Sequence, residues 1–574
     1  MSRRALALLT ILVVGIVLGI LPWTVASDRV KAAIARQVRE EYGVDLTVEG
    51  RATLALLPVP RVKLEGVTLS GGSGAFAAKA SQLRAELRLL PLLAARLRLS
   101  ELRISDADVR VALDAPESYR WAADGLQRRL AAGASGSARV ERLVVTGSHL
   151  TLTRADGSAV RFGKVGALVR WPDPTSALDL TVTTEWQGEG LTLGITGLDP
   201  AQLIDGKADM IDLRFTSRVG SVTGSGLLTW TSAPRFLGTI TARTPSLTTL
   251  TRWTGIGLDL QDLDRPVELL GDATVGPEGI EWPKAVLTLG TDRLDGSIAY
   301  RLDRARPQLR ATLAGEDIDL SWVVPMADPA HVESPHVDYD VRLSAAVLRT
   351  GLVRLQDAAA GVLVNDQRLE MSLARATVAG GAVRGRVTAS LEGEARDIRG
   401  QVGLINVDLE RLLGETGIRR GFLGTVSGQA TFEASGERQP DFGRQIRGRG
   451  TVTVRDGEFP GLSLGDAGRT RATVGTPPEW RGGKTRFGSA TLALELANGL
   501  LDIHEGTMDT PTSQTSLKGR VSLVDGTLDL RTSTKAAGPS PTARPLALEV
   551  RGPIAKPNVT AEAVAQDAPV SRAP

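Results

Sequence analysis

The sequence predicts a mainly β protein that is built from many short antiparallel strands. Apolar and polar residues alternate with a period of two over most of the chain, as in RVKLEGVTL (residues 61–69), and this period is typical of strands with one apolar face. Glycine is frequent at 63 residues and aromatic residues make up only 4%, which suits short strands better than a compact catalytic core. Pairs that favour hairpin turns lie between alternating runs at Asp156-Gly157, Asp456-Gly457, Asn498-Gly499 and Asp525-Gly526.

Length, charge and cysteine content exclude several classes of function. At 574 residues the chain is long enough for several domains or for one extended domain. The formal net charge is only +3, and Lys and Arg are dispersed among Asp and Glu without the basic stripe of a nucleic-acid-binding protein. The sequence contains no cysteine, which excludes disulfides, zinc-thiolate sites and cysteine nucleophiles. We therefore predict no nucleic-acid partner.

The first segment is strongly apolar and predicts a membrane anchor. Ala5–Val25 carries no charge and reaches the length of about 20 residues that spans a hydrocarbon core. Arg3 and Arg4 precede it and favour a cytoplasmic N-terminus. A cleaved signal peptide is the alternative, although its apolar core would be about 7–15 residues long. We predict an uncleaved single-pass anchor over residues 1–27, with the bulk of the chain outside the cytoplasm.

A helix is predicted directly after the anchor. Within residues 28–42, Val30, Ile34, Val38 and Tyr42 recur every four residues and form one apolar stripe. Two interpretations stay open for this helix. It either packs as an ordinary element at the start of the domain, or it lies on the membrane face or plugs the mouth of the sheet.

Alternating strands then begin at Gly43 and continue almost to the end of the chain. Leucines in Ser81–Leu99 could form a helical stripe, but Pro91 would break it, so strand, turn and strand is the better prediction. Later strands follow one another at about 8–12 residues, which is typical of an all-β protein. The last strand is predicted at Leu546–Val550. Short helices or loops interrupt the strands at Pro116–Gly133, Ser246–Trp253, Trp322–His336 and Asp408–Leu413.

Two parts of the chain carry the patterns of a known family. The N-terminal part contains the anchor, the helix predicted over residues 28–42, LTVEGRATLALLPVPRVKLEGVTL and LRLLPLLAARLRLSELRISDADVRV, with the Pro-Leu-Leu turn at Pro91. The C-terminal part contains VDLERLLGETGIRRGFLGTVSGQATFEASG, IRGRGTVTVRDGEFPGLSL and SLKGRVSLVDGTLDLR. Both parts resemble the AsmA family, a set of bacterial proteins that are anchored in the inner membrane and project into the periplasm. The resemblance covers Met1–Val111 and Asn406–Val559, whereas the middle of the chain is similar only in being rich in strands.

The resemblance implies a domain organisation and a fold. The fold class is mainly β, with an N-terminal transmembrane helix, an extended antiparallel sheet curled into a groove, and a few short helices. The predicted regions are an anchor (1–27), an AsmA-like N-terminal region (28–135), a central β region (136–400), an AsmA-like C-terminal β region (401–535), and a Pro-rich, largely disordered tail with one candidate strand (536–574).

The resemblance also implies a role in lipid transport or lipid homeostasis, because larger relatives resemble bridge-like lipid transfer proteins. Candidate lining residues of the groove lie on the apolar faces of their predicted strands. They are Val62, Leu64, Leu97, Leu99, Val109, Val111, Leu492, Leu494, Leu496, Val521, Leu523, Leu528 and Leu530. The alternative is that these apolar faces pack on helices or on a second sheet, as in a sandwich.

Catalytic and metal-binding motifs are missing from the sequence. The closest histidines, His331 and His336, do not have the spacing of a helical metal pair. Gly483-Lys484-Thr485 imitates the end of a phosphate-binding loop, but Pro478 stands where its first glycine belongs. No GxSxG nucleophile elbow is present. We therefore predict no enzyme activity, no cofactor and no metal.

The function predicted from the sequence is passive shielding of phospholipid between the inner and outer membranes. Its partners would be phospholipid, the inner membrane, and a periplasmic or outer-membrane protein. The alternative is a periplasmic scaffold or regulator of outer-membrane protein assembly that conducts no lipid. A periplasmic hydrolase is a third hypothesis and would need a cleft with convergent polar groups. A continuous, uncovered apolar strip favours the groove, and a covered strip favours the scaffold.

Overall fold

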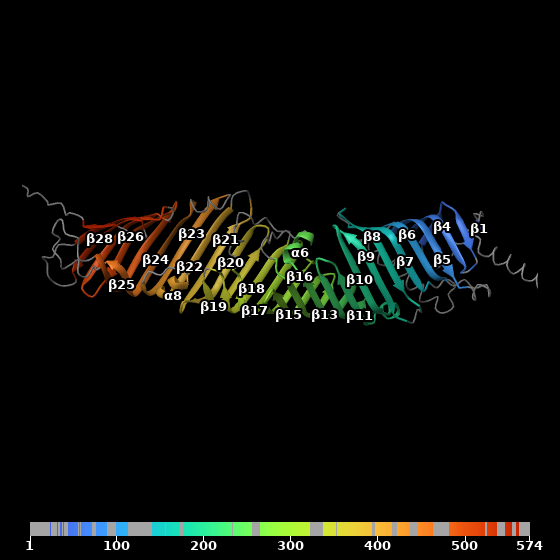
Figure 1. Cartoon of the computed structure of the whole chain (residues 1–574), viewed down its shortest axis with the longest axis horizontal. Coiled ribbons are helices and arrows are strands. Elements are labelled where there is room, and N and C mark those ends of the chain that lie inside the picture. The colour runs from blue at the N-terminus through green and yellow to red at the C-terminus, as the bar shows by residue number, and fades with distance from the viewer. Residues whose placement is uncertain are drawn as a thin grey trace, which may run out of the picture. The chain divides into compact units, whose positions relative to one another are not determined.

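The computed structural model describes most of the predicted strands. The described residues are 23–24, 31–32, 35–36, 38–39, 44–55, 57, 59–71, 76–88, 99–112, 140–154, 157–172, 176–231, 233–254, 264–321, 337–351, 353–392, 396–415, 422–436, 445–462, 481–522, 525–536, 546–553 and 558–561. They form two compact units, Met1–Thr254 with Asp264–Pro283 and Gly255–Leu263 with Lys284–Pro574. Figure 1 shows the strands of each unit as inclined ribbons that run side by side.

The first unit is an open sheet in which strands pair mostly with their neighbours in sequence. Its strands are β1 (Trp23–Thr24), β2 (Val44–Val48), β3 (Ala52–Ala55), β4 (Arg61–Gly71), β5 (Phe76–Leu87), β6 (Leu99–Ala112), β7 (Arg142–Thr153), β8 (Ala159–Arg170), β9 (Leu178–Trp186), β10 (Glu189–Leu198), β11 (Asp209–Thr216), β12 (Ser221–Trp230), β13 (Pro234–Thr244) and β14 (Val267–Gly276). Both β2 and β3 pair with β4, and β1 pairs with β3. The strand pairs between β1 and β14 are antiparallel except β6 with β7, which are parallel.

The second unit has the same construction. Strand β15 (Gly279–Leu289) contains the boundary between the units, and the strands that follow are β16 (Asp292–Arg301), β17 (Gln308–Asp319), β18 (Asp338–Arg349), β19 (Arg354–Val364), β20 (Arg368–Val378), β21 (Gly381–Ser390), β22 (Arg396–Asp408), β23 (Leu423–Gly436), β24 (Arg447–Leu462), β25 (Arg481–Ala497), β26 (Leu500–Asp509), β27 (Ser513–Ser522), β28 (Thr527–Ala536), β29 (Leu546–Pro553) and β30 (Asn558–Ala561). Strands β17 and β18 are parallel, and the later pairs are antiparallel. The mainly β fold class is therefore confirmed.

Few helices accompany the strands. Helix α6 (Leu247–Thr254) and helix α8 (Leu409–Glu415) confirm the short helices predicted at Ser246–Trp253 and Asp408–Leu413. Helix α5 (Pro200–Ile204), which Asp199 caps by accepting from the amide of Ala201, was not predicted. The described residues between 31 and 39 are helical, as the stripe after the anchor predicts. The segments at Pro116–Gly133 and Trp322–His336 lie outside the described residues, as does the tail beyond Ala561.

The predicted anchor lies outside the described residues except for Trp23–Thr24, which form strand β1 opposite Leu54 and Thr53. Across the described part of the chain, no helix has both the length and the apolar character that crossing a membrane requires.

Three of the four predicted hairpins are confirmed, and one is wrong. Asn498 and Gly499 form the two-residue turn that joins β25 to β26. Their φ values of 52° and 76° are the positive values that such a tight hairpin turn requires at both positions. Strands β7 and β8 pair up to Thr153 and Ala159, and β27 and β28 up to Ser522 and Thr527. Asp456, in contrast, has a φ of 48° in the middle of β24, where it forms a bulge and the strand continues.

The two strands predicted on either side of Pro91 are also confirmed, since β5 and β6 pair antiparallel down to Leu87 and Leu99. The turn itself lies outside the described residues. Strand β29 confirms the strand predicted at Leu546–Val550, and β30 adds one that was not predicted.

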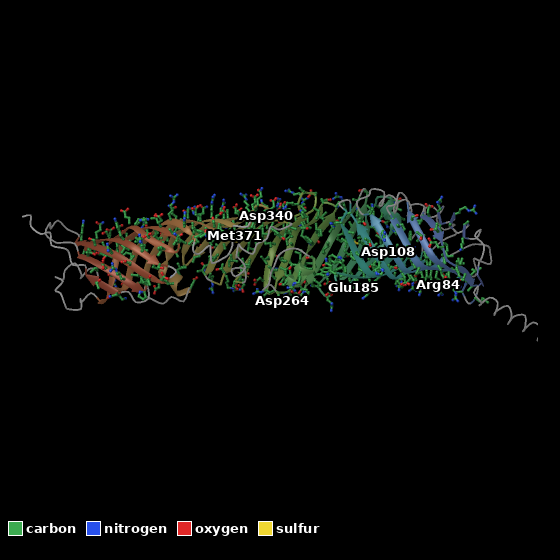
Figure 2. The ribbon with its side chains drawn as sticks, turned by 90° about the horizontal axis from the view of Figure 1, so that it is seen from above. Arg84, Asp108, Glu185, Asp264, Asp340 and Met371 are labelled. Atoms are coloured by element: carbon green, nitrogen blue, oxygen red, sulfur yellow. The ribbon has the colours of Figure 1, made fainter. Side chains whose placement is uncertain are left out.

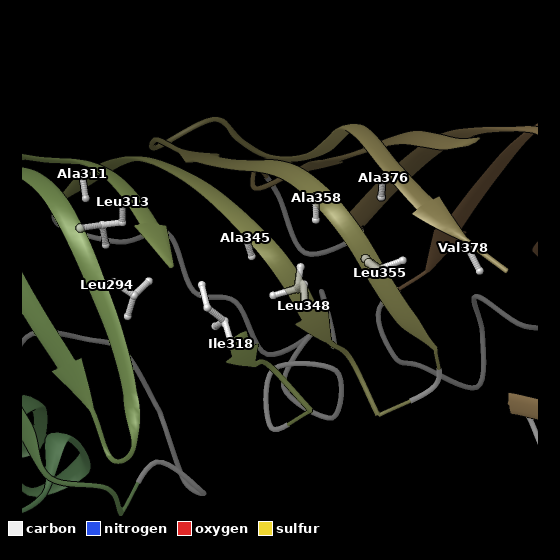
Figure 3. Close-up of a cluster of buried hydrophobic side chains, with 10 residues drawn as sticks. All are labelled: Leu294, Ala311, Leu313, Ile318, Ala345, Leu348, Leu355, Ala358, Ala376 and Val378. Atoms are coloured by element: carbon white, nitrogen blue, oxygen red, sulfur yellow. The ribbon is translucent and has the colours of Figure 1, made fainter. Parts of the chain in front are cut away.

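Each unit buries a core on one face of its sheet. In the first unit, Leu46, Ala52, Leu64 and Val67 form a buried cluster, against which Ala35 and Val38 of the N-terminal helical segment pack. The largest cluster of the second unit comes from β16 to β20, and Figure 3 shows its side chains. Leu412 of helix α8 packs against this cluster from outside the sheet. The packing interpretation of the N-terminal helix is thereby supported.

Candidate functional site

The register of the strands decides which side chains share a face. Residues that are directly opposite in a ladder point to the same side of a sheet, so a row of successive partners can be followed from strand to strand. The register of successive strand pairs therefore identifies the side chains that share a face.

An unbroken apolar row crosses the first unit from β3 to β14. We call it the first-unit apolar row, and each member is the register partner of the next. Its members are Leu54, Val62, Ala85, Leu102, Leu143, Val169, Leu180, Ile195, Leu213, Gly224, Ile240 and Gly271. No polar side chain interrupts it.

A second unbroken row crosses the second unit from β16 to β29. We call it the second-unit apolar row. Its members are Gly296, Leu313, Leu343, Ala360, Leu373, Gly385, Val402, Ala430, Gly450, Leu494, Ile503, Gly519, Leu530 and Val550. The apolar strip is therefore continuous within each unit.

The opposite face of the second unit is polar along the adjacent row, which we call the second-unit polar row. Its members are Ser297, Thr312, Arg342, Gly361, Ser372, Arg386, Gln401, Thr431, Arg449, Glu495, Asp502, Arg520, Asp529 and Arg551. Ion pairs join strands on this face, such as Arg520 with Asp502 at 2.7 Å. Figure 2 shows side chains whose nitrogen and oxygen tips project from the ribbon.

The two faces of the second unit differ in exposure. Side chains of the polar row stand out into solvent, with Arg342 and Arg520 each 70% exposed. Most members of the apolar row are half-buried, yet Val362 and Val402 on this face remain 37% and 38% exposed. The apolar face therefore has sheltered side chains but open places along it.

Close contacts between glycine and phenylalanine fill gaps in the second unit. On the apolar face, Phe432 of β23 pairs with Gly400 of β22, and its ring lies so close that a Cβ on Gly400 would overlap it. Phe487 of β25 covers its partner Gly457 of β24 equally closely. These glycines make room for a ring that lies flat along the sheet.

Most of the predicted lining residues lie on these apolar faces. Val62, Val109 and Val111 are half-buried in the first unit, and Leu99 begins β6 opposite Leu87. Leu64 is only 2% exposed, because it belongs to the cluster under the N-terminal helical segment.

In the second unit, the predicted leucines of β25 are half-buried and Leu496 pairs with Leu501. Leu492 lies opposite Val452, and Leu494 belongs to the second-unit apolar row. Val521 lies opposite Leu528 across the turn, whereas Leu530 lies opposite Gly519. Leu97 and Leu523 lie outside the described residues.

Polar groups near the apolar faces are neutralised or paired. Burial raises the pKa of Tyr339, so its phenol stays neutral beside Leu309. Glu458 is buried but receives hydrogen bonds from Lys484 at 2.6 Å and Arg486 at 2.8 Å, which hold the pKa of its carboxyl below the ordinary value. Lys484 and Thr485 lie within strand β25 rather than in a glycine-rich loop, so they form no phosphate-binding loop.

The structure also reveals groups that the sequence analysis did not single out. Eight of the twelve members of the first-unit apolar row and six of the fourteen members of the second-unit apolar row lie in the central region, residues 136–400, where the sequence indicates only many strands. Phe162, Trp186 and Trp253 form an aromatic cluster between β8, β9 and α6. The alternation of β8 and β9 could have marked the first two, but no sequence signal places Trp253 beside them. Over the described residues, no group of His, Asp and Glu side chains is arranged to hold a metal ion.

Comparison with known families decides the relationship of the chain. A model of the AsmA family matches residues 1–145 and 327–505, which together make up more than half of the chain. The chain belongs to the AsmA family. The match to the AsmA family extends beyond Val111 at the N-terminus and ends before β27 at the C-terminus. The searches of curated proteins and of solved structures returned no match.

Proposed function

We propose that this AsmA-family protein is a passive, non-enzymatic structure that shields phospholipid acyl chains from water as they move between membranes. In this proposal it is anchored in the bacterial inner membrane, and the bulk of the chain lies in the periplasm. The single observation that carries the proposal is the continuity of the apolar row in each unit. A lipid tail that follows such a row meets no polar side chain along it.

The difference in exposure supports a curled sheet whose apolar face is the concave one. Side chains converge on the concave face of a curved sheet and diverge on the convex face. The half-buried apolar row and the widely exposed arginines of the polar row have the exposures expected of these two faces. A concave apolar face surrounds an acyl chain, and its charged head group stays at the open side.

The energetics favour a strip over isolated apolar sites. Burying an acyl chain is worth about 0.8 kcal/mol per methylene, so a chain of ordinary length cannot leave the apolar environment without a large cost. A continuous row lets each methylene enter apolar surroundings as another leaves. Such motion needs no nucleotide site, and direction would come from a partner or from the lipid gradient.

The scaffold alternative predicts a covered apolar strip. The N-terminal helical segment covers part of the first unit, and α8 covers one cluster of the second. Val362 and Val402 nevertheless remain open on the second-unit apolar face. The exposure of these two side chains therefore favours lipid shielding over a scaffold whose faces are filled by its own chain.

Two adjacent residues of β22 provide a matched test. Val402 and Gln401 are both exposed but point to opposite faces of the sheet. Full-length protein would be purified in a mild detergent and analysed by native mass spectrometry for bound phospholipid. We expect Val402→Asp to lose most of the bound lipid and Gln401→Asp to keep it. Absence of lipid from the parent protein, or equal losses in both variants, would contradict the proposal.

A further inference from the structure

Three aromatic side chains meet at one edge of the first unit. The ring of Trp186, at the end of β9, lies 6.3 Å from that of Phe162 on β8. The ring of Trp253 meets Trp186 edge to face, with centroids 4.8 Å apart. Trp253 Nε1 also donates a hydrogen bond to the main-chain oxygen of Trp186 at 3.4 Å. We call these three residues the aromatic clasp.

The clasp draws helix α6 back across the edge of the sheet. In the antiparallel ladder from β9 to β13, the ends of β9, β11 and β13 lie at the same edge. Helix α6 follows β13, yet Trp253 in its last turn contacts the end of β9. Ser246 caps the helix by accepting from the amide of Thr249 at 3.1 Å, which helps to fix its start. The helix therefore reaches over the strand ends that separate β13 from β9.

An apolar cavity of about 230 Å³ lies beside the clasp, on the apolar face of β7 to β11. Its walls include Leu150, Leu152, Phe162, Val182, Leu193 and Phe215. The polar side chain in the wall is Thr184, and its hydroxyl already donates to the main-chain oxygen of Gly163 at 2.9 Å. The cavity thus offers no unsatisfied hydrogen-bonding side chain to a ligand.

The chemistry of this wall selects the ligand. An apolar cavity of about 150 Å³ in another protein stays dry and binds benzene, so a larger cavity with a similar lining can hold several methylene groups. A polar or charged ligand would lose its hydration and gain no partner there. An unbranched hydrocarbon chain has no polar group whose hydration would be lost.

We propose that this cavity is a discrete binding site for one unbranched acyl chain, and that α6 with its clasp retains the chain there. The inference rests on the proposed lipid-shielding function and adds a defined resting place within it. The continuous row allows a chain to slide, whereas the cavity, which shares Phe162 with the clasp, holds it at one position.

Photolabelling tests the site directly. Full-length protein in mild detergent is incubated with palmitic acid that carries a diazirine in the middle of its chain, irradiated and mapped by peptide mass spectrometry. We expect labelling to be concentrated in β7 to β11 and on Trp253. Leu193→Trp fills the cavity and should reduce this labelling about tenfold, the factor that corresponds to losing the burial of two methylene groups.

The control introduces the same residue on the polar face of the other unit. Gln401→Trp should leave labelling of the cavity unchanged, and thermal melts show whether each variant is folded. If labels spread evenly along both apolar rows, the discrete site is wrong although lipid shielding survives. If no label reaches either apolar row, the proposed function itself is wrong.

The role of α6 has a separate readout. Removing the ring contact with Trp253→Ala should speed dissociation of the bound palmitic acid roughly two- to tenfold. Trp230→Ala, which changes a tryptophan of β12 outside the clasp, should leave the dissociation rate unaltered. An unchanged rate in Trp253→Ala would contradict retention by α6.

Discussion

The two units have the same plan but protect their apolar faces differently. The first unit covers parts of its face, with Ala35 and Val38 of the N-terminal helical segment at one place and the Trp253 contact of α6 at another. The second unit is covered at one cluster, against which Leu412 of α8 packs, and leaves Val362 and Val402 open. A continuous apolar row therefore does not by itself decide access, because short helices determine which part of the row a ligand can reach.

The opposite faces differ as well. In the second unit, the polar row carries charged, amide and hydroxyl side chains, apart from Gly361. In the first unit, Met210, Leu227 and Leu237 are register partners on the face opposite the apolar row, and Met210 and Leu237 are 61% and 57% exposed. Exposed apolar side chains thus form a row across three strands in the first unit, whereas Ile405, which is 53% exposed on the polar face of the second unit, lies outside its polar row.

The largest expected effect tests the covered part of the first unit. Leu64→Ala removes a side chain that is 2% exposed and should cost about 2 to 5 kcal/mol in local stability. Leu530→Ala, on the half-buried second-unit apolar row, should cost only about 1 kcal/mol, since part of its surface is already in water. Hydrogen exchange of β4 and β28 measures both. Equal losses would remove the contrast between covered and open faces.

A smaller loss of stability is expected where the ring of Phe432 covers the sheet in place of a helix. Gly400→Ala pushes a methyl group into the ring of Phe432 and should destabilise β22 and β23 by about 1 to 3 kcal/mol. Gly414→Ala is the matched control, because nothing lies within 4 Å of its new methyl group. Urea unfolding of the two variants gives the difference. If Gly400→Ala is as stable as Gly414→Ala, the ring contact contributes nothing to the open face.

The buried carboxylate of the second unit predicts a dependence on pH. Lys484 and Arg486 hold the pKa of Glu458 below its ordinary value of 4.5, so its contribution is present above that value and is lost as pH falls through the lowered pKa. The parent protein should therefore melt higher than Glu458→Gln at pH 7. Melting curves between pH 7 and pH 3 should show this gap closing below pH 4.5. A gap that is constant with pH would count against the ion pairs.

The smallest effect concerns the exposed leucine of the first unit. Leu237→Lys should change stability by no more than about 0.5 kcal/mol, because the side chain is 57% exposed and packs little. It should also reduce self-association, measured by light scattering as a function of concentration. A large loss of stability would show that this face is packed in the same way as the apolar row.

Much of the fold was predictable because alternation is a local property. The strands around Pro91 and the hairpin at Asn498-Gly499 follow from patterns of a few residues. Asp456-Gly457 misled because Asp followed by Gly suits a bulge as well as a turn, and only the partners of β24 distinguish the two. The hidden position of Leu64 also depended on a partner, the helical segment that packs on it.

The candidate site, like the fold, depends partly on local sequence patterns and partly on contacts between distant parts of the chain. The sequence by itself determined that each strand has an apolar and a polar side, because successive side chains of a strand point in opposite directions. Only the tertiary structure decided that these sides align into unbroken rows, since register depends on pairing between strands. It also decided that Trp253 returns to Trp186, a contact between residues 67 positions apart that no local pattern specifies.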